Sequence, residues 1–241
     1  MLVIPVLDVK GGVVVHAKMG LRSSYKPLTS PVYSTCNPSE LGLKLLRDGF
    51  KVVYVADLDS IMGGSPSIDV LSSLRRLGLS IVADLGVDSD YKLELAIKHA
   101  DCVVVATEST PSLEFLSQSL SAIGVERAML SLDVKGGLVV SRCRELSNAS
   151  LEEAASKAEE LGFRSVLLID FDRIGSYSGP NLDGIKLLLK RGFEVYCGGG
   201  VRDIADLEVL RSLGVRGVLV ASALYFGRIS VKELREKSFL Q

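Results

Sequence analysis

The sequence has no tryptophan, only two histidines and four cysteines among its 241 residues. The cysteines are far apart, and none belongs to a Cys-x-x-Cys pair: Cys36, Cys102, Cys143 and Cys197. Structural zinc sites usually draw their Cys and His ligands from such closely spaced pairs. The sequence therefore predicts four reduced thiols and no bound metal.

The sequence also lacks an excess of charge of either sign. It has 28 Lys plus Arg against 29 Asp plus Glu, and its formal net charge is −1. A chain with so little net charge has no long-range electrostatic attraction for nucleic acid or for an anionic membrane. We therefore expect neither as a partner, and any bound anion must be recognised by a local site.

Long apolar runs are absent as well. The first residues, MLVIPVLDVKGG, have no basic segment, and their apolar run is broken at Asp8. No stretch approaches the roughly 18 apolar residues of a membrane-spanning helix. We expect a soluble, cytoplasmic protein without a signal peptide.

Short apolar, β-branched runs alternate with amphipathic stretches along the chain. Apolar runs without polar alternation are typical of strands that are covered on both faces, and helices between strands make those strands parallel. The sequence predicts eight such strands, at 3–8, 51–57, 80–84, 102–107, 128–133, 165–170, 194–197 and 217–222.

Capping residues mark two of the expected helices. Asn37 precedes a proline in the first turn and is followed by Glu40, a pattern that predicts an N-cap with a capping-box acid. Ser150 and Glu153 repeat the pattern. We expect a helix to begin at each place.

An internal repeat favours a closed barrel over an open sheet. The hexapeptide LDVKGG stands at 7–12 and again at 132–137, and Asp-x-Asp follows at 57–59 and 170–172. Two four-stranded halves that pair with each other leave no exposed sheet edge. Together with the length, this predicts a single (β/α)8 TIM barrel over 1–241, made of two similar half-barrels at about 1–124 and 125–241.

Four aspartates end predicted strands. The carboxyl end of a barrel strand is where functional side chains are found, and a partly buried carboxyl can serve as a general base or, protonated, as a general acid. Asp8 and Asp133, at equivalent places in the repeat, are the candidates for these roles. The alternative is that they only hold their own Lys-Gly-Gly turns. Asp170 and Asp57 end the next strand in each half, where turn capping is the competing interpretation.

A phosphate site is predicted after the last two strands. The segment GGGV at 198–201 follows the seventh strand, and VASAL at 220–224 closes the eighth. Glycine allows backbone N–H groups to approach an anion, and barrels commonly bind phosphate here, aided by a helix N-terminus. The candidate residues are Gly199, Gly200 and Ser222; a plain tight turn is the alternative.

The equivalent place in the first half has acidic residues. Aligned on the repeat, Asp84 stands in the position of Gly198 and Glu108 in that of Ala223. At about 4 Å, each carboxylate opposes a unit negative charge by roughly 1 kcal/mol in water and about 4 kcal/mol near a protein surface. We therefore expect no second phosphate site of the same kind.

A polar, turn-rich stretch at 17–34 follows the first strand. It is typical of a mobile lid, from which Arg22, Tyr25 and Lys26 could close over a substrate, although an ordinary solvated loop is the alternative. We expect structural roles for the two histidines, His16 and His99.

Over nearly all of its length the chain resembles the histidine-biosynthesis barrel family, which includes the ProFAR isomerase HisA and the cyclase HisF. HisA is the nearer of the two, and the residues that carry the resemblance are IDFDRIGSYSGPN at 169–181, GGGV at 198–201 and ASALYFG at 221–227. The resemblance implies an Amadori-type rearrangement by proton transfer between two aspartates, without metal or organic cofactor. It implies Asp8 as the base, Asp133 and Asp170 as the acid and its support, and a phosphate cradle of Gly199, Gly200, Ala221 and Ser222.

The chain departs from the HisA pattern at several positions. Family isomerases have a glycine-rich turn after the third strand for a second phosphate, whereas here the turn reads DLGV. Ile169 and Ile174 replace a usual threonine and aspartate. These departures predict a HisA-related paralogue, an isomerase of a metabolite with one phosphate.

Two alternatives remain. The first is a genuine ProFAR isomerase that holds the second phosphate with the 17–34 segment and Thr107. The second is a phosphate-binding subunit without turnover that works with a protein partner, as HisF-type barrels do. A homo-oligomer is compatible with all three hypotheses.

Overall fold

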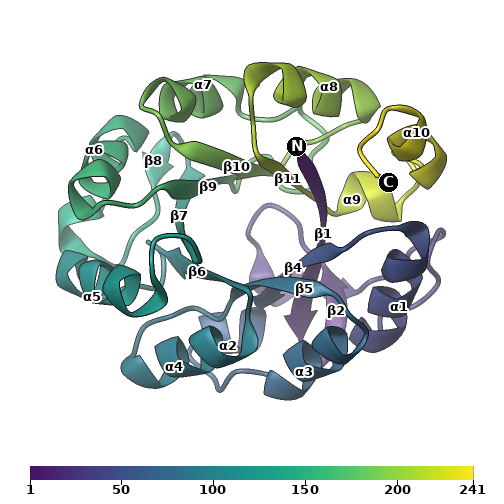
Figure 1. Ribbon diagram of the computed structural model, residues 1–241, viewed down its shortest axis with the longest axis horizontal. Coiled ribbons are helices and arrows are strands. Elements are labelled where there is room, and N and C mark those ends of the chain that lie inside the picture. The colour runs from purple at the N-terminus through teal and green to yellow at the C-terminus, as the bar shows by residue number, and fades with distance from the viewer. Residues whose placement is uncertain (241) are drawn as a thin grey trace.

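Eight parallel strands close into a barrel in the computed structural model, which describes residues 1–240 (Figure 1). The last strand pairs with the first, with Leu2 opposite Gly217 and Pro5 opposite Val220, so this wall has no free edge. The predicted (β/α)8 fold and its eight strands are confirmed. In order around the wall, the strands are Leu2–Lys10 (β1), Val52–Asp57 (β4), Ser80–Asp84 (β5), Cys102–Ala106 (β6), Ala128–Lys135 (β7), Ser165–Asp170 (β9), Glu194–Gly198 (β10) and Gly217–Val220 (β11).

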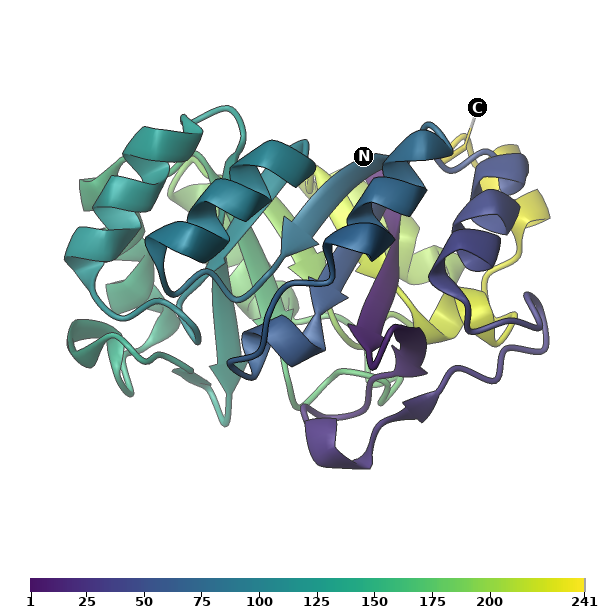
Figure 2. The same cartoon turned by 90° about the horizontal axis from the view of Figure 1, so that it is seen from below.

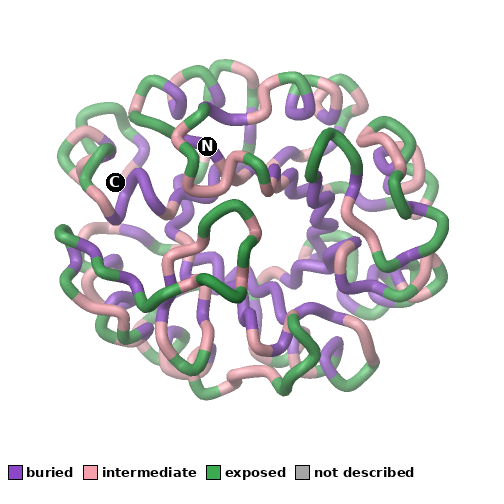
Figure 3. The backbone as a smooth tube through the Cα atoms, turned by 180° about the vertical axis from the view of Figure 1, so that it is seen from behind, coloured by how far each residue is buried: buried purple, intermediate pink, exposed green. Residues whose placement is uncertain are grey.

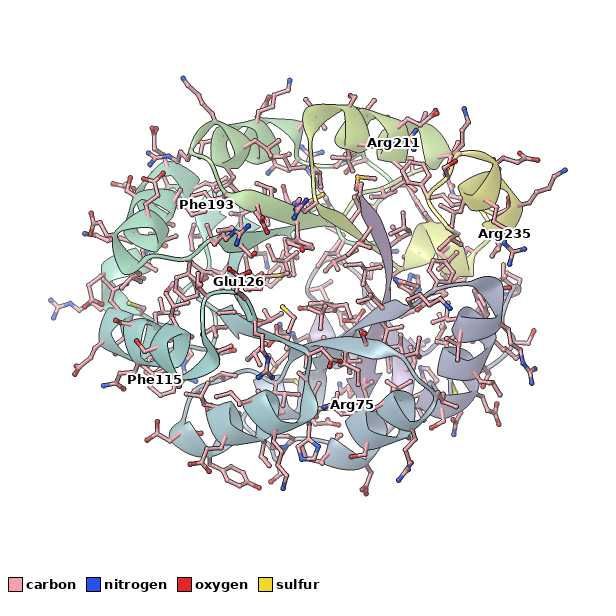
Figure 4. All side chains as sticks on the ribbon, viewed as in Figure 1. Arg75, Phe115, Glu126, Phe193, Arg211 and Arg235 are labelled. Atoms are coloured by element: carbon pink, nitrogen blue, oxygen red, sulfur yellow. The ribbon has the colours of Figure 1, made fainter. Side chains whose placement is uncertain are left out.

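Helices surround this wall, and charged side chains such as Arg75 and Arg235 lie on this outer ring (Figure 4). The longer helices are Pro38–Asp48 (α1), Ile68–Arg76 (α3), Asp90–His99 (α4), Leu113–Ile123 (α5), Leu151–Leu161 (α6), Leu182–Lys190 (α7), Ile204–Leu213 (α8) and Val231–Glu236 (α10). There are also two single helical turns. Leu58–Ile61 (α2) directly follows β4, and Ser222–Tyr225 (α9) begins two residues after the end of β11. Among residues 1–240, no helix is long and apolar enough to cross a membrane.

Both predicted helix starts are present, but only one has the predicted capping box. At α6, the Ser150 and Glu153 side chains bind each other's backbone N–H groups. At α1, Asn37 caps the helix as predicted, yet the role expected of Glu40 is wrong. The Asn37 N–H donates to the Thr35 hydroxyl oxygen instead, and Glu40 accepts a hydrogen bond from that hydroxyl at 2.7 Å. The Thr35 hydroxyl thus bridges the Asn37 N–H and the Glu40 carboxylate, which would bind each other directly in a capping box.

Apolar side chains fill two layers, one inside the barrel and one between the barrel and the helices. The inner layer includes Ile4, Tyr54, Met129, Leu167 and Leu219. The outer layer is larger and takes the alternate residues of the strands together with the inner faces of the helices. Because both faces of each strand are buried, the strand sequences are apolar throughout.

Three short strands were not predicted: Val13–His16 (β2), Lys26–Pro27 (β3) and Leu138–Val139 (β8). They form antiparallel hairpins on β1 and β7 beyond the barrel wall. In each hairpin the two glycines of the repeated hexapeptide make the turn, with φ of 57° and 77° at Gly11 and Gly12 and of 59° and 81° at Gly136 and Gly137. Two residues with positive φ are what a type I′ turn requires, and glycine adopts that conformation without strain.

The second aspartate of each Asp-x-Asp motif holds one of these hairpin turns. The Gly11 N–H donates to Asp59 Oδ2 at 2.6 Å, and the Gly136 N–H donates to Asp172 Oδ2 at 2.7 Å. The two halves of the sequence repeat therefore make the same contact. The division into two half-barrels remains a prediction that this contact supports.

The carboxyl ends of the strands meet at one face of the molecule. In Figure 2 the arrows of β1 and β7 point to the lower edge, and the purple segment that follows β1 lies beyond that edge. Seen from behind in Figure 3, exposed loops surround and cross the barrel opening, whereas the wall itself is buried. In barrels of this fold, functional residues gather at this face.

Candidate active site

A cavity opens at the carboxyl ends of the strands, and residues from all eight wall strands or the loops after them line it. Four carboxyl groups, one arginine and two small-residue turns face the same space, together with apolar side chains. The polar and small lining residues include Asp8, Asp84, Glu108, Asp133, Arg22, Tyr25, Gly198, Gly199, Gly200, Ala221 and Ser222. Six of the seven predicted site residues thus share one cavity; Asp170 is not among its lining residues.

Asp8 lies on β1 opposite Ala56 of β4 and Val15 of β2, and it is partly buried. Burial raises the pKa of its carboxyl to about 7, and among the nearby charges Arg22 lowers the pKa while Asp84 raises it. A carboxyl that titrates near neutral pH can remove a proton from carbon more effectively than one with an ordinary pKa. Asp8 therefore has the chemistry of a general base.

Asp133 lies on β7, across the barrel from β1, and is only 2% exposed. Burial and the neighbouring Glu108 raise the pKa of Asp133 well above its ordinary value, although the Ser131 hydroxyl donates to its Oδ1 at 2.8 Å. A carboxyl that stays protonated can donate a proton. Asp8 and Asp133 therefore form a pair of carboxyls on opposite sides of the barrel, both with raised pKa values.

Asp84 and Glu108 extend the acidic side of the cavity. The Gly86 N–H donates to Asp84 Oδ1 at 2.9 Å and the Tyr54 hydroxyl donates to Asp84 Oδ2 at 3.3 Å. Burial and Glu108 raise the pKa of Asp84 to about 6. Both residues line the cavity, as the alignment of the sequence repeat predicted.

Arg22 is the one cationic side chain that lines the cavity, in the part of the chain that the structure describes. It forms an ion pair with Glu108, and its guanidinium lies 5.9 Å from the ring centre of Phe171. Lys10 donates to its carbonyl oxygen at 2.8 Å. The 17–34 segment thus lies over the barrel mouth through Arg22 and Tyr25, while Lys26 is not a lining residue; whether the segment moves stays a prediction.

The glycines after β10 are in a conformation that other residues rarely adopt. Gly199 has φ of 97° and Gly200 has φ of 83°. A Cβ on Gly200 would lie 2.1 Å from the Gly179 carbonyl oxygen, so only glycine fits. Within residues 1–240 the Gly200 N–H has no acceptor, which leaves it free for an anion.

His16, for which the sequence predicted a structural role, contacts Ser222 at the start of α9. Its Nε2 lies 3.0 Å from the Ser222 hydroxyl oxygen, within hydrogen-bond distance, and its ring packs on Phe226 at 4.9 Å between ring centres. Burial and Lys18 lower the pKa of His16, which favours the neutral ring. No local sequence signal identifies this contact, because 206 residues separate the two partners.

Asp170 has a different environment from the other predicted acids. Its carboxylate accepts hydrogen bonds from Arg173 Nε at 3.1 Å, from Asn181 Nδ2 at 3.0 Å and from the Asp172 N–H at 3.1 Å. These bonds order the loop after β9, next to the Gly199 turn. The equivalent Asp57 caps α2 and accepts from the Ser67 N–H, as the turn-capping interpretation predicts.

No group of three or more His, Cys, Asp or Glu residues in 1–240 is arranged to hold a metal ion. All four cysteines are free thiols. The ion pairs at the other end of the barrel, where Arg164 bridges Glu126 and Glu194 at 2.8 and 2.9 Å, involve exposed side chains outside the cavity (Glu126 is labelled in Figure 4).

Comparison with known proteins gives a consistent assignment. The family model described as histidine biosynthesis protein matches residues 2–230. An uncharacterized protein of Methanocaldococcus jannaschii is 33% identical over 241 residues, which cover 98% of this chain and 99% of that protein. A ProFAR isomerase of Thermoanaerobacter pseudethanolicus is 32% identical with the same coverage, and one of Cenarchaeum symbiosum is 31% identical over 96% of this chain and 98% of its own length. The name of both isomerases gives a substrate with two phosphoribosyl groups on an imidazole carboxamide.

Proposed function

Because the chain belongs to the histidine-biosynthesis protein family and is an isomerase of that family, we propose that it moves a proton between adjacent carbons of a small metabolite with one phosphate. In this proposal Asp8 is the base and Asp133 the acid. Gly199, Gly200, Ala221 and Ser222 hold the phosphate, and Asp170 supports the loop beside them. No cofactor takes part.

One observation carries the proposal. Two carboxyls with raised pKa values line the same cavity as a glycine turn that has a free N–H group. The acids and the turn lie on different strands, so a ligand held by its phosphate at β10 and β11 extends toward β1 and β7. Such fixed placement of a substrate against an acid and a base is what proton transfer at carbon needs.

The reaction follows from these roles. Asp8 takes the proton from a hydroxyl-bearing carbon next to a carbonyl or imine carbon, and the electron pair moves toward the heteroatom, which receives a proton from Asp133. The resulting enediol or enaminol then regains a proton from Asp8 on the former carbonyl or imine carbon, while the neighbouring hydroxyl group gives its proton to Asp133 and becomes the new carbonyl group. Both carboxyls return to their starting state once the protons have exchanged.

The test uses Asp8→Asn. With a panel of singly phosphorylated aldoses, ketoses and glycosylamines in deuterated water, the wild-type protein should exchange a carbon-bound proton of its substrate, as followed by NMR. Asp8→Asn should lower this rate by about 10²–10⁴-fold, the usual effect of losing a general base. Its affinity for inorganic phosphate, measured by calorimetry, should stay within about twofold, because base and cradle lie on different strands. Residual exchange above about a hundredth of the wild-type rate removes Asp8 from the role of base.

A second candidate is the ProFAR isomerase reaction itself, which the names of two close relatives favour. It requires a site for the second phosphate on the acidic side of the cavity. Thr107, one expected ligand, is fully buried, its hydroxyl donates to the Val140 carbonyl at 2.9 Å, and it does not line the cavity. Among residues 1–240, Arg22 is then the one cationic side chain in the cavity that could bind this phosphate. Growth of a histidine auxotroph that carries this gene in place of its own isomerase gene would favour this candidate.

A further inference from the structure

We propose that the substrate of this cavity carries a cationic ammonium group at the end remote from its phosphate. The inference rests on the proposed function, because it uses the same cavity and the same phosphate turn. It adds the chemical class of the second recognition group, which neither the fold nor the names of the relatives give.

The two ends of the cavity differ in charge. Toward β10 and β11 the lining consists of the Gly198–Gly200 turn, Ala221, Ser222, Tyr177 and apolar side chains, and none of these residues carries a carboxyl group. Toward β5, β6 and β7 it contains Asp84, Glu108 and Asp133. A ligand that spans the cavity therefore has an anion-binding turn at one end and carboxyl groups at the other.

The hydrogen bonds of the acidic end leave acceptor capacity unused. Asp84 accepts only the Gly86 N–H and the Tyr54 hydroxyl, one on each oxygen, and is 4% exposed. Asp133, 98% buried, accepts the Ser131 hydroxyl on Oδ1, and its Oδ2 has no partner among residues 1–240 although the side chain lines the cavity. A carboxylate oxygen can accept two hydrogen bonds, and a carboxyl that is protonated on one oxygen still accepts on the other, so both side chains have unfilled acceptor positions.

The one cation present does not supply them. Arg22 is paired with Glu108, and these two charges compensate each other. Asp84 has no cationic partner within salt-bridge distance among the described residues; the buried Lys92 binds Asp88 and the Ser60 and Gly86 carbonyls instead. An anionic group here would face Asp84 uncompensated, or would have to take Arg22 away from Glu108 and leave that carboxylate unpaired.

An ammonium group fits this arrangement in charge and in hydrogen bonding. It has three N–H donors and no acceptor; the Asp84 carboxylate on β5 provides the negative charge and acceptor positions, and Asp133 on β7 adds a further acceptor oxygen. A divalent metal is the competing cation, but no cluster of three metal-ligating side chains exists in the described part of the chain. A neutral hydroxyl group is the remaining alternative, and the experiment below distinguishes a hydroxyl from an ammonium group.

The test compares four probes that differ only at one end. Straight-chain alkyl phosphates of three to six carbons are made with a terminal methyl, hydroxyl, ammonium or second phosphate group, and each is titrated into the protein by calorimetry at pH 8. The ammonium probe of best length should bind about 10- to 100-fold more tightly than its methyl counterpart, the range of one charge-assisted hydrogen bond. The hydroxyl probe should gain less than about threefold, and the bisphosphate should be the weakest.

Variants then assign the effect to the acidic end. Asp84→Asn should reduce the advantage of the ammonium probe to within about threefold while its affinity for inorganic phosphate is unchanged. Asp69→Asn, which alters an exposed aspartate in the first turn of α3, is the matched control and should keep the full advantage. Because the wild-type comparison among probes needs no variant, a folding defect in Asp84→Asn leaves the main result intact.

Each other outcome overturns a definite statement. If inorganic phosphate binds but the methyl and ammonium probes are equal, the ammonium inference is wrong and the proposed function stands. If the hydroxyl probe matches the ammonium probe, the second group is a neutral donor. Tightest binding of the bisphosphate favours the ProFAR isomerase candidate, and absence of phosphate binding by any probe rejects the proposed function together with the inference.

Discussion

Substitution of Gly200 by alanine tests the phosphate turn most directly. With φ of 83°, Gly200 is in the left-handed region, where alanine costs roughly 1–2 kcal/mol. The added Cβ would lie 2.1 Å from the Gly179 carbonyl oxygen and 2.8 Å from its carbon, too close for any real contact, so the loop after β9 must move. That movement breaks the 2.9 Å hydrogen bond from the Gly179 N–H to the Gly200 carbonyl.

The two effects together should lower the free energy of unfolding by about 2–4 kcal/mol. The affinity for inorganic phosphate should fall at least about tenfold, because the free Gly200 N–H shifts from its position at the cavity. Denaturant unfolding and calorimetric titration with phosphate measure the two quantities on the same preparation.

Gly192→Ala provides the matched control. Gly192 has nearly the same φ, 87°, but a Cβ there would have no atom within 4 Å, and it lies at the start of the strand rather than at its carboxyl end. This variant should lose only about 1–2 kcal/mol and should bind phosphate like the wild type. Equal losses of stability in both variants, or unchanged phosphate affinity in Gly200→Ala, would refute the role given to the turn.

Two further predictions concern ligand binding. His16→Ala should weaken inorganic phosphate binding by about three- to tenfold, because the ring no longer holds the Ser222 hydroxyl. Calorimetric titration with phosphate measures this effect, and His99→Ala is the control. An affinity equal to that of the wild type would remove His16 from the site. A ligand with one phosphate should bind more tightly than ProFAR, because Asp84 and Glu108 line the far end of the cavity. Titration of both ligands, repeated with Asp84→Gly, tests this prediction, and micromolar affinity of the unaltered protein for ProFAR contradicts it.

The barrel could be predicted because its signals are local. Each wall strand is a short apolar run, and the observed bounds of β5 and β9 coincide with the predicted ones. The hairpins after β1 and β7 were missed even though a local signal was present: two glycines between apolar residues at 11–12 and 136–137 are typical of a two-residue hairpin turn. The Lys-Gly-Gly segments were expected to turn, but not to continue into the short antiparallel strands β2 and β8.

The site was predictable only in part. Strand ends and glycine runs indicate which residues reach the mouth of a barrel, so Asp8, Asp133 and the Gly199 turn could be chosen from the sequence. The partners of those residues could not, because they depend on loops that meet only in the folded chain. Arg22 and Glu108 are 86 residues apart, and no periodicity or spacing predicts that they pair.

The pKa of Asp8 leads to a prediction that separates loss of catalysis from loss of structure. The folded protein raises the pKa of this carboxyl from 3.8 to about 7, mainly by burial, so between these pH values the folded state holds a proton that the unfolded state has lost. Stability therefore falls as the pH rises from about 4 to about 7 and stays lower above that range. Since one pKa unit corresponds to about 1.4 kcal/mol, the ionised carboxyl lowers the free energy of unfolding by at most about 4 kcal/mol at pH 8.

Asparagine has nearly the shape of aspartate and cannot ionise. Asp8→Asn should therefore be about 1–3 kcal/mol more stable than the wild type at pH 8 and no more stable at pH 4, even as it loses proton exchange at carbon. Denaturant unfolding at pH 4, 6 and 8 measures this, with Asp69→Asn as an exposed aspartate that should show no such trend. A variant that is inactive and more stable has lost a functional group rather than its fold. If Asp8→Asn is instead destabilised at pH 8, or differs from the wild type equally at every pH, then burial does not hold Asp8 near neutrality and the basis for its role as a base is removed.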